Sequence, residues 1–257
     1  MSRYIPKPSP NFDARTRPID LVVLHYTGMQ NADIALARLT DPGPVAGNYP
    51  GPWQSDDVEA DAPLVRVSTH YVVDEAGQVY SLVAEEHRAW HAGVASWEGD
   101  GDINARAIGI EIVNGGHDFD LPDFTDAQIG SVIALLKEIF GRWPQLNAKR
   151  VVGHSDVAPA RKADPGEKFP WRRLADAGVS FWPRPTSDEL DNDDPISAAQ
   201  QQLAFIGYGV TQTGYADEAT RAAIVAFQRR FRPSDLSGHL DEETRRLLAA
   251  VARIIKQ

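Results

Sequence analysis

The chain has 257 residues, 42% of them hydrophobic, which is enough apolar material for one large domain or for a medium domain with a small companion. Its 36 acidic and 26 basic residues give a formal net charge of −10, a balance that argues against a nucleic-acid partner. The absence of cysteine excludes disulfides, thiolate metal sites and a cysteine nucleophile. Any metal must therefore be held by His, Asp or Glu.

The N-terminal segment, residues 1–18, is rich in proline and polar residues and is expected to lie extended over the surface. It lacks the apolar core of a signal peptide, and no stretch of the chain is long and apolar enough for a membrane span. These features favour a cytoplasmic location. The periplasm or the cell envelope is the alternative, because a chain trimmed of its signal would look the same.

Short aliphatic runs predict the strands of an α/β domain, with a central mixed sheet flanked by helices. The expected strands cover residues 19–25, 69–74, 78–83, 107–113 and 150–154. The first of them ends in His25 and the last in His154. In the fourth strand, alternation places Glu111 on the face opposite the isoleucines.

One helix is clearly indicated between these strands. It begins after Thr125, which forms a capping box with Gln128, and apolar residues then recur at helical spacing. A shorter helix is expected near residues 32–39. The segment 41–63 is too dense in proline and glycine for regular structure, and loops of that length are usually functional or mobile.

The amino-acid composition changes towards the C-terminus. Residues 1–185 form the first predicted domain, residues 186–194 an acidic linker, and residues 195–257 a small helical domain. An internal repeat supports the last of these, since each copy contains a glycine turn, an Asp N-cap and an amphipathic helix. With the helix from Pro195 this predicts a three-helix unit. Its expected core is Leu203, Ile206, Ile224, Phe227, Phe231, Leu247, Leu248 and Ile254.

The chemistry-bearing residues gather at strand ends. His25 and His154 end two strands, and the loop after His154 brings back Asp164. Two histidines and an aspartate are ligands that Zn²⁺ accepts, with a fourth position left for water. By residue type alone, a histidine at a strand end is more often a hydrogen-bonded structural residue than a ligand, and an Asp before Pro-Gly more often forms a turn.

Several motifs occur in one order. They are LHYTGM at residues 24–29, WHAG at 90–93, IGIE at 108–111, and GHSDVAP with DPG at 153–166. Together they resemble the type 2 N-acetylmuramoyl-L-alanine amidase family, which shares its fold with the peptidoglycan recognition proteins. The resemblance covers residues 1–180. The tail is similar to the small three-helix peptidoglycan-binding domain, on shorter motifs.

This resemblance implies a zinc-dependent hydrolase that cuts the amide bond between the muramic acid sugar and L-alanine in peptidoglycan or muropeptides. It places the zinc ligands at His25, His154 and Asp164. It places a general base and acid at Glu111 and an oxyanion-stabilising residue at Lys162.

The substrate contacts are expected at His91, in WHAG, and at Asn104, although packing and a turn are competing roles for the two. A non-catalytic peptidoglycan-binding protein is the alternative function, and a metal peptidase that cuts farther along the stem peptide is a second one. The sequence leaves open whether the substrate is polymeric or a recycled anhydromuropeptide. It does not reveal the oligomeric state.

Overall fold

The computed structural model describes residues 4–43, 65–184 and 194–257. Its main sheet has the strand order β1-β5-β4-β7-β3-β8, and within it only β4 and β5 pair antiparallel. These strands are β1 (Ile5–Pro6), β3 (Leu21–Tyr26), β4 (Tyr71–Val73), β5 (Val79–Ser81), β7 (Ala107–Ile112) and β8 (Val151–Gly153). A separate antiparallel ribbon joins β2 (Phe12–Ala14) to β6 (His87–Ala89).

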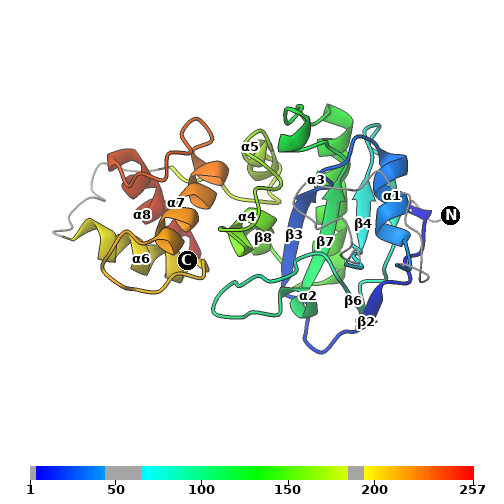
Figure 1. Ribbon diagram of the computed structural model, residues 1–257, viewed down its shortest axis with the longest axis horizontal. Coiled ribbons are helices and arrows are strands. Elements are labelled where there is room, and N and C mark those ends of the chain that lie inside the picture. Colours follow the sequence, from blue (N-terminus) through cyan, green and yellow to red (C-terminus); the bar gives the residue numbers. More distant parts are fainter. Residues whose placement is uncertain (1–3, 44–64, 185–193) are drawn as a thin grey trace.

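Helices lie around the sheet, so the mixed α/β fold expected from the sequence is confirmed (Figure 1). They are α1 (Ala32–Thr40), α2 (Ile103–Arg106), α3 (Asp126–Arg142), α4 (His154–Val157), α5 (Trp171–Asp176), α6 (Pro195–Ile206), α7 (Glu218–Phe231) and α8 (Glu242–Lys256). Two 3-10 turns, His117–Phe119 and Ala148–Arg150, complete the regular structure of the described residues. Among these residues, none of the helices combines the length and the apolar character that crossing a bilayer requires.

The sheet has two different faces. Val22 and Leu24 of β3 point into one core together with the isoleucines of β7 and the apolar side of α3. Leu21 and Val23 point into a second core on the other face. Burial of each such side chain away from water contributes about 1.5–3 kcal/mol to the stability of the fold. This alternation decides which strand residues are available for a site on the second face.

The start of α3 follows its sequence signature. Thr125 accepts from the Gln128 backbone N–H, and the Gln128 side chain accepts from the Thr125 backbone N–H. Such a cap contributes about 1 kcal/mol. The capping box is therefore confirmed, and it fixes the helix that covers the first core.

Some elements differ from the expectation. The last strand ends at Gly153 rather than at His154, and His154 is the first residue of α4. The physical reason is that Asp156 Oδ2 accepts from the Gly153 backbone N–H at 2.8 Å, which turns the chain into a helix at that point. The N-terminal segment is not simply extended over the surface, because two short strands within it join the sheets: β1 pairs with β5, and β2 pairs with β6. The expected loop at 41–63 lies outside the described residues after Gly43.

The C-terminal residues form three helices, as the internal repeat predicts. Their N-caps are Asp194, Asp217 and Asp241, each accepting from the backbone N–H three residues later. The expected core residues are buried except Ile254, which is half-buried. Of the predicted linker only Asp194 is described, and the domain boundaries stay a prediction.

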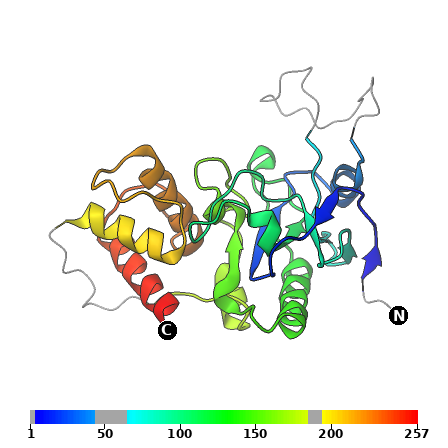
Figure 2. The ribbon, with the colours of Figure 1, turned by 90° about the horizontal axis from the view of Figure 1, so that it is seen from below.

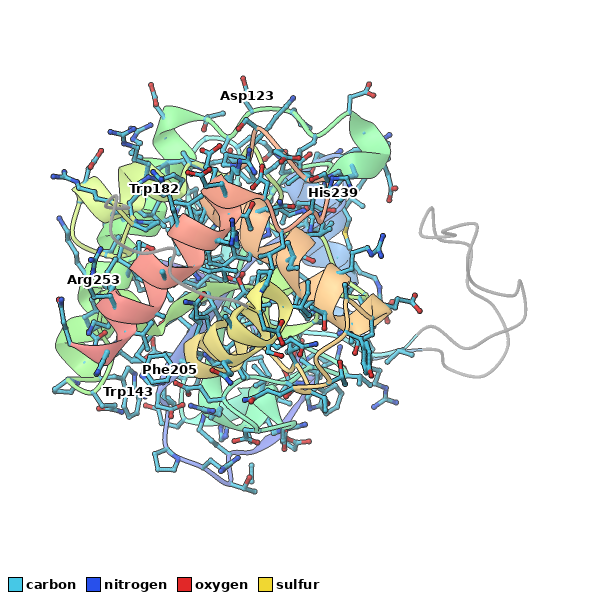
Figure 3. The ribbon with its side chains drawn as sticks, turned by 90° about the vertical axis from the view of Figure 1, so that its left-hand side faces the viewer. Asp123, Trp143, Trp182, Phe205, His239 and Arg253 are labelled. Carbon is cyan, nitrogen blue, oxygen red and sulfur yellow. The ribbon has the colours of Figure 1, made fainter. Side chains whose placement is uncertain are left out.

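The three-helix unit packs directly against the sheet domain. Figures 1 and 2 show α6, α7 and α8 beside the edge strand β8 and the short helix α4. One continuous core joins Val152 of β8 and Val157 of α4 to Leu203, Phe227 and other residues of the unit. Figure 3 views the molecule from this unit, where Phe205 is exposed on α6.

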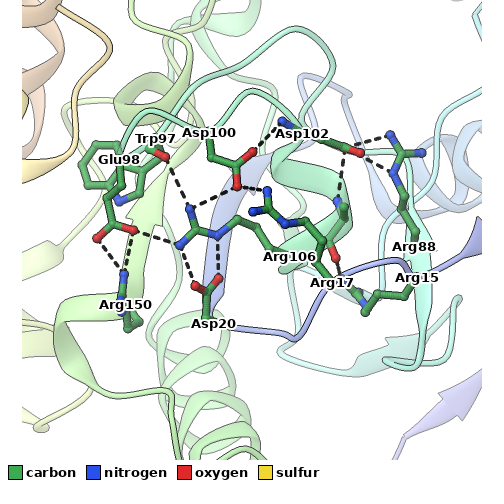
Figure 4. A network of polar contacts seen from close by, with 11 residues as sticks. Arg15, Arg17, Asp20, Arg88, Trp97, Glu98, Asp100, Asp102, Arg106 and Arg150 are labelled. Atoms are coloured by element: carbon green, nitrogen blue, oxygen red, sulfur yellow. Dashed lines mark hydrogen bonds and ion pairs between the residues drawn. The ribbon is translucent and has the colours of Figure 1, made fainter.

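A charged network braces the loop between β6 and α2 against other parts of the sheet domain (Figure 4). Arg106 donates to Asp20 and to Glu98, and Arg150 also donates to Glu98. The backbone N–H of Glu98 donates to the Gly207 carbonyl at 2.8 Å, just past the end of α6. The network therefore fixes this loop, and the Glu98 backbone connects it to the three-helix unit through one hydrogen bond.

Candidate metal centre

Two neighbouring parallel strands place a histidine beside a glutamate. His25 of β3 and Glu111 of β7 are partners in the register, near the carboxyl ends of both strands. They lie on the face opposite the core that α3 covers, as alternation predicts. Gly109 shares this face, and a Cβ there would stand 2.5 Å from His91 Cγ. Glycine at position 109 therefore makes room for the His91 imidazole.

The second histidine comes from the turn after β8. His154 opens α4, and its carbonyl accepts from the Ala158 N–H at 2.9 Å. The Ser155 N–H donates to the Asp164 carbonyl at 2.8 Å, which brings the loop back beside the helix. This local folding places Asp164 next to His154, although the two are ten residues apart in sequence.

Three buried side-chain atoms converge between these elements. His25 Nδ1 and His154 Nδ1 are 3.0 Å apart, and Asp164 Oδ2 is 3.0 Å from each of them. The ligand atoms of a tetrahedral Zn²⁺, each bound at about 2.0–2.1 Å, stand about 3.3 Å from one another. The group is therefore compatible with a metal ion, and the structure brings together the three residues that the sequence predicts as ligands.

Contacts at the opposite edges of the imidazoles orient them. His154 Nε2 donates to the Ala92 carbonyl at 3.0 Å, which leaves the Nδ1 lone pair directed at the group. His25 Nε2 lies 3.1 Å from His91 Nδ1. Histidines that bind metals usually donate their other ring N–H in this way, which fixes the tautomer and the ring orientation.

The protonation of the group suits a cation. Burial, and then the nearby charge of His154, lowers the pKa of His25 to about 4, so this imidazole is neutral near pH 7. Burial alone would raise the pKa of Asp164, but its contacts with the two histidines outweigh that effect and hold the pKa well below its ordinary value. The group therefore offers lone pairs and a negative charge.

Glu111 lies at the edge of this group. Its Oε1 is 3.9 Å from His25 Nδ1, and its side chain is 12% exposed. Burial, followed by the charge of Asp164, raises the pKa of Glu111 well above its ordinary value, and the charge of Lys162 opposes this. Glu111 Oε2 is buried and makes no hydrogen bond within the described part of the chain. A carboxyl group in this setting is suited to taking and giving protons.

A cavity of about 510 Å³ opens over the group, and Lys162 is half-buried in its wall. His25, Glu111 and Asp164 line the same cavity. The structure thus brings Lys162 to the residues with which the sequence predicts it to act.

The two predicted substrate contacts have structural partners. His91 is buried, and its Nδ1 faces His25. Asn104 is also buried, and its Oδ1 accepts from the backbone N–H groups of His91 and Ala92. Both side chains line a second cavity of about 610 Å³, so contact with substrate stays a prediction for each. Asn104 thus fixes the backbone of His91, and His91 contacts the His25 imidazole.

The two cavities adjoin, because they share part of their walls, and together they are called the groove. The shared residues are Val67, Trp90, His91, His154, Arg161 and Lys162. Sequence reasoning assigned no role to Arg161, whose guanidinium donates to the carbonyls of Ala92 and Val94 at 2.7 and 2.8 Å. The sequence feature that could have pointed to Arg161 is its position directly before Lys162.

Comparisons with known proteins agree with this site. The family model described as N-acetylmuramoyl-L-alanine amidase matches residues 15–167. A second model, described as a putative peptidoglycan binding domain, matches residues 192–248.

Two curated relatives carry the same family name. The chain is 32% identical over 252 residues to N-acetylmuramoyl-L-alanine amidase AmiD of Escherichia coli K12, covering 91% of this chain and 82% of that protein. It is 33% identical to 1,6-anhydro-N-acetylmuramyl-L-alanine amidase AmpD of Haemophilus influenzae, over 64% of this chain and 86% of that protein.

Solved structures show the same likeness. The crystal structure of AmpDH3 from Pseudomonas aeruginosa superposes with a TM-score of 0.76 at 31% identity, over 94% of both chains. A complex of Escherichia coli AmiD with the substrate anhydro-N-acetylmuramic acid-L-Ala-D-gamma-Glu-L-Lys gives 0.73 at 30% identity, over 94% of this chain and 92% of that one. The chain belongs to the N-acetylmuramoyl-L-alanine amidase family.

Proposed function

We propose that this protein is a zinc-dependent N-acetylmuramoyl-L-alanine amidase that hydrolyses the amide between anhydromuramic or muramic acid and L-alanine. One observation carries the proposal: a group of two histidines and an aspartate lies beside a buried carboxyl group, Glu111, that has no hydrogen bond to its Oε2 in the described residues. The names of the relatives support the bond and the anhydromuramyl substrate.

The donor set fits zinc. His25 and His154 supply imidazole nitrogens and Asp164 an ionised oxygen, which is the ligand chemistry of three-residue catalytic zinc sites. A bound Zn²⁺ would polarise the scissile carbonyl and lower the pKa of water near it.

Glu111 would move the proton. Hydrolysis adds the oxygen of water to the carbonyl carbon, breaks the C–N bond and leaves a lactyl carboxylate and a free alanine amine. Glu111 would accept a proton from the attacking water and release it to the alanine nitrogen. The pKa of Glu111, raised above its ordinary value by burial, helps the carboxyl group to hold the proton between the two transfers.

Lys162 would stabilise the negative charge that develops on the carbonyl oxygen. Lys162 lines the same cavity as Glu111 and Asp164, and it is half-buried. Positive charge fixed in such a place is worth more in the transition state than in bulk water.

The arm of the groove away from the metal group suits an anionic peptide. Among the described residues of its wall, Arg66, Arg88 and Arg161 are basic and Asp13 is acidic, and Arg88 pairs with Asp13 and Asp102. The stem peptide of a muropeptide carries carboxylates, and arginine pairs with carboxylates in a fixed, bidentate geometry. This arm would therefore receive the stem peptide, although the chain as a whole is acidic.

A non-catalytic binding protein on the same fold is the competing function. Such a protein needs no partnerless carboxyl group beside its histidines, because leaving a buried polar atom unpaired costs stability without benefit to binding. The setting of Glu111 therefore favours the enzyme.

The test uses a purified anhydromuramyl tripeptide in water enriched in ¹⁸O, with the wild-type chain and with Glu111→Gln. We expect the wild type to release the intact tripeptide with a free L-alanine amine and to place one ¹⁸O in the lactyl carboxylate. Glu111→Gln should bind the tripeptide and leave it uncut. Tight binding without cleavage by the wild type would support the binding protein instead, and label in a peptide carboxylate would indicate a peptidase.

A further inference from the structure

The three-helix unit contacts the segment that carries two of the three proposed ligands. Asp156 lies in α4, two residues after His154, and it is completely buried. Tyr208, just past α6, donates its hydroxyl to Asp156 Oδ1 at 2.6 Å. Arg230 of α7 donates to Asp156 Oδ2 at 2.9 Å. A residue of the catalytic segment is thus held from outside the sheet domain.

Arg230 is itself fixed in place. It is 4% exposed, its second terminal nitrogen donates to the Val151 carbonyl of β8 at 2.9 Å, and its guanidinium stacks 4.2 Å from the Trp171 ring centre. Stacking and a planar fork give arginine one orientation at such a site. Tyr208 packs edge-on against Trp97, with ring centres 5.2 Å apart. Both donors therefore present a rigid pair of groups to Asp156.

The same carboxylate controls the path of the ligand segment. Asp156 Oδ2 also accepts from the Gly153 N–H, which sets the start of α4 and hence the position of His154. Ser155, which lies between His154 and Asp156, donates its backbone N–H to the Asp164 carbonyl. Gly153 lies so close to the following loop that a Cβ there would stand 2.8 Å from Pro165 Cδ. A shift of Asp156 would consequently move both ligands.

A second series of contacts links α7 to the strand that carries His25. Arg229 of α7 lies 3.5 Å from Glu167, and Glu167 lies 3.0 Å from His117. His117 Nδ1 accepts from the Tyr26 hydroxyl at 2.9 Å, and Tyr26 follows the third ligand, His25. Two adjacent arginines of one helix thus reach both sides of the metal group.

We propose that Tyr208 and Arg230 are positioning residues of the metal centre: acting through Asp156, they hold His154 and Asp164 in ligating geometry. This inference rests on the proposed zinc site. It makes the three-helix unit a structural part of the active site, and not only a module that concentrates the enzyme on its substrate.

The experiment uses the full chain and measures metal binding without substrate. Tyr208→Phe removes one hydroxyl and keeps the packing against Trp97. Arg230→Met removes the charge and keeps most of the volume. The matched control is Leu248→Val in the core of the same unit, fully buried and outside the contacts of Asp156. Zinc affinity is measured by competition with a chelating dye, the ligand geometry by the visible spectrum of the Co²⁺-loaded chain, and folding by thermal unfolding of the metal-free chain.

We expect Arg230→Met to weaken zinc binding by about 10-fold, the lower end of the range for outer-sphere partners. Tyr208→Phe should weaken it by at least about 3-fold, as the loss of one hydrogen bond to a charged group implies. Both should alter the Co²⁺ spectrum, whereas Leu248→Val should lower only the unfolding temperature.

Two results would overturn the inference alone: wild-type zinc affinity and spectrum in a folded Tyr208→Phe, or an equal loss of affinity in Leu248→Val, which would indicate general destabilisation. A wild-type chain that binds no zinc would refute the proposed function, and the inference with it. The two failures are therefore distinguishable in one set of measurements.

Discussion

His25 and Glu111 occupy opposite positions in the register of β3 and β7, with 3.9 Å between His25 Nδ1 and Glu111 Oε1. A ligand and a proton carrier thus come from two adjacent central strands, where the backbone of each is fixed by hydrogen bonds to its neighbours. Rigid elements hold a site more closely than loops do. This relationship underlies the predictions for the metal and for the chemistry.

Glu111→Gln should retain the metal and lose most of the activity. The amide preserves the size of the side chain but cannot accept the proton from water, and such a loss costs roughly 10²–10⁴-fold in turnover. Steady-state kinetics and metal analysis on the same preparation test this. A variant with normal turnover would remove Glu111 from the mechanism.

His154→Ala should lose the metal. It takes away one of three donor atoms, so the metal content should fall from about one ion per chain towards none, as the coordination by three protein ligands implies. His239→Ala is the control, because that histidine is exposed in the three-helix unit (Figure 3). Equal metal content in both variants would place the ion elsewhere.

His91→Phe should weaken metal binding, although the phenyl ring can still pack against Gly109 as the imidazole does. The change removes the Nδ1 atom that lies 3.1 Å from His25 Nε2, and the loss of such a partner typically costs 10–100-fold in affinity, as an order of magnitude. Unchanged zinc affinity together with a raised KM would instead favour the predicted role of His91 in substrate binding.

Glu85→Gln should reduce the sensitivity of the fold to acid. Burial would raise the pKa of Glu85, but hydrogen bonds from Arg142, Trp143 and Tyr71 outweigh it and lower the pKa below its ordinary value of 4.5. A depressed folded-state pKa gives stability that is present above pH 4.5 and is lost as the pH falls further.

The measurement is the free energy of unfolding by urea between pH 3 and pH 7, in wild type and variant. The wild-type curve should fall more steeply below about pH 4.5 than the Glu85→Gln curve. Glu86→Gln is the matched control, because its carboxylate is exposed and should leave the slope unchanged. Parallel curves for wild type and Glu85→Gln would show that Glu85 titrates alike in the folded and unfolded chains.

The sequence was sufficient for the parts of the fold that depend on local patterns. The strands around His25 and Glu111 and the helix after Thr125 follow from alternation, helical spacing and a capping box. The strands β1, β2 and β6 have only two or three residues each, too few for a periodic signal. The sequence predicts His154 within a strand, because the hydrogen bond that starts α4 comes from a side chain of the helix itself, at Asp156.

The candidate metal group could be predicted from the sequence because its residues stand in recognisable motifs, although His25 is far in sequence from His154 and Asp164. The role of Asp156 could not be predicted. Its partner Arg230 is 74 residues away, and an acidic segment between them suggests a flexible connection rather than a docked unit. Only the packed structure shows that contact.

Removal and return of the metal test the central claim most directly. An anhydromuramyl tripeptide is incubated with the wild-type chain before and after dialysis against a chelator, and again after addition of one equivalent of Zn²⁺, with the products identified by mass spectrometry. We predict that the wild-type chain releases the intact tripeptide with a free L-alanine amine. This cleavage should be lost after dialysis against the chelator and should return when zinc is added. Cleavage that survives complete removal of the metal, or that occurs at another bond, would contradict the account.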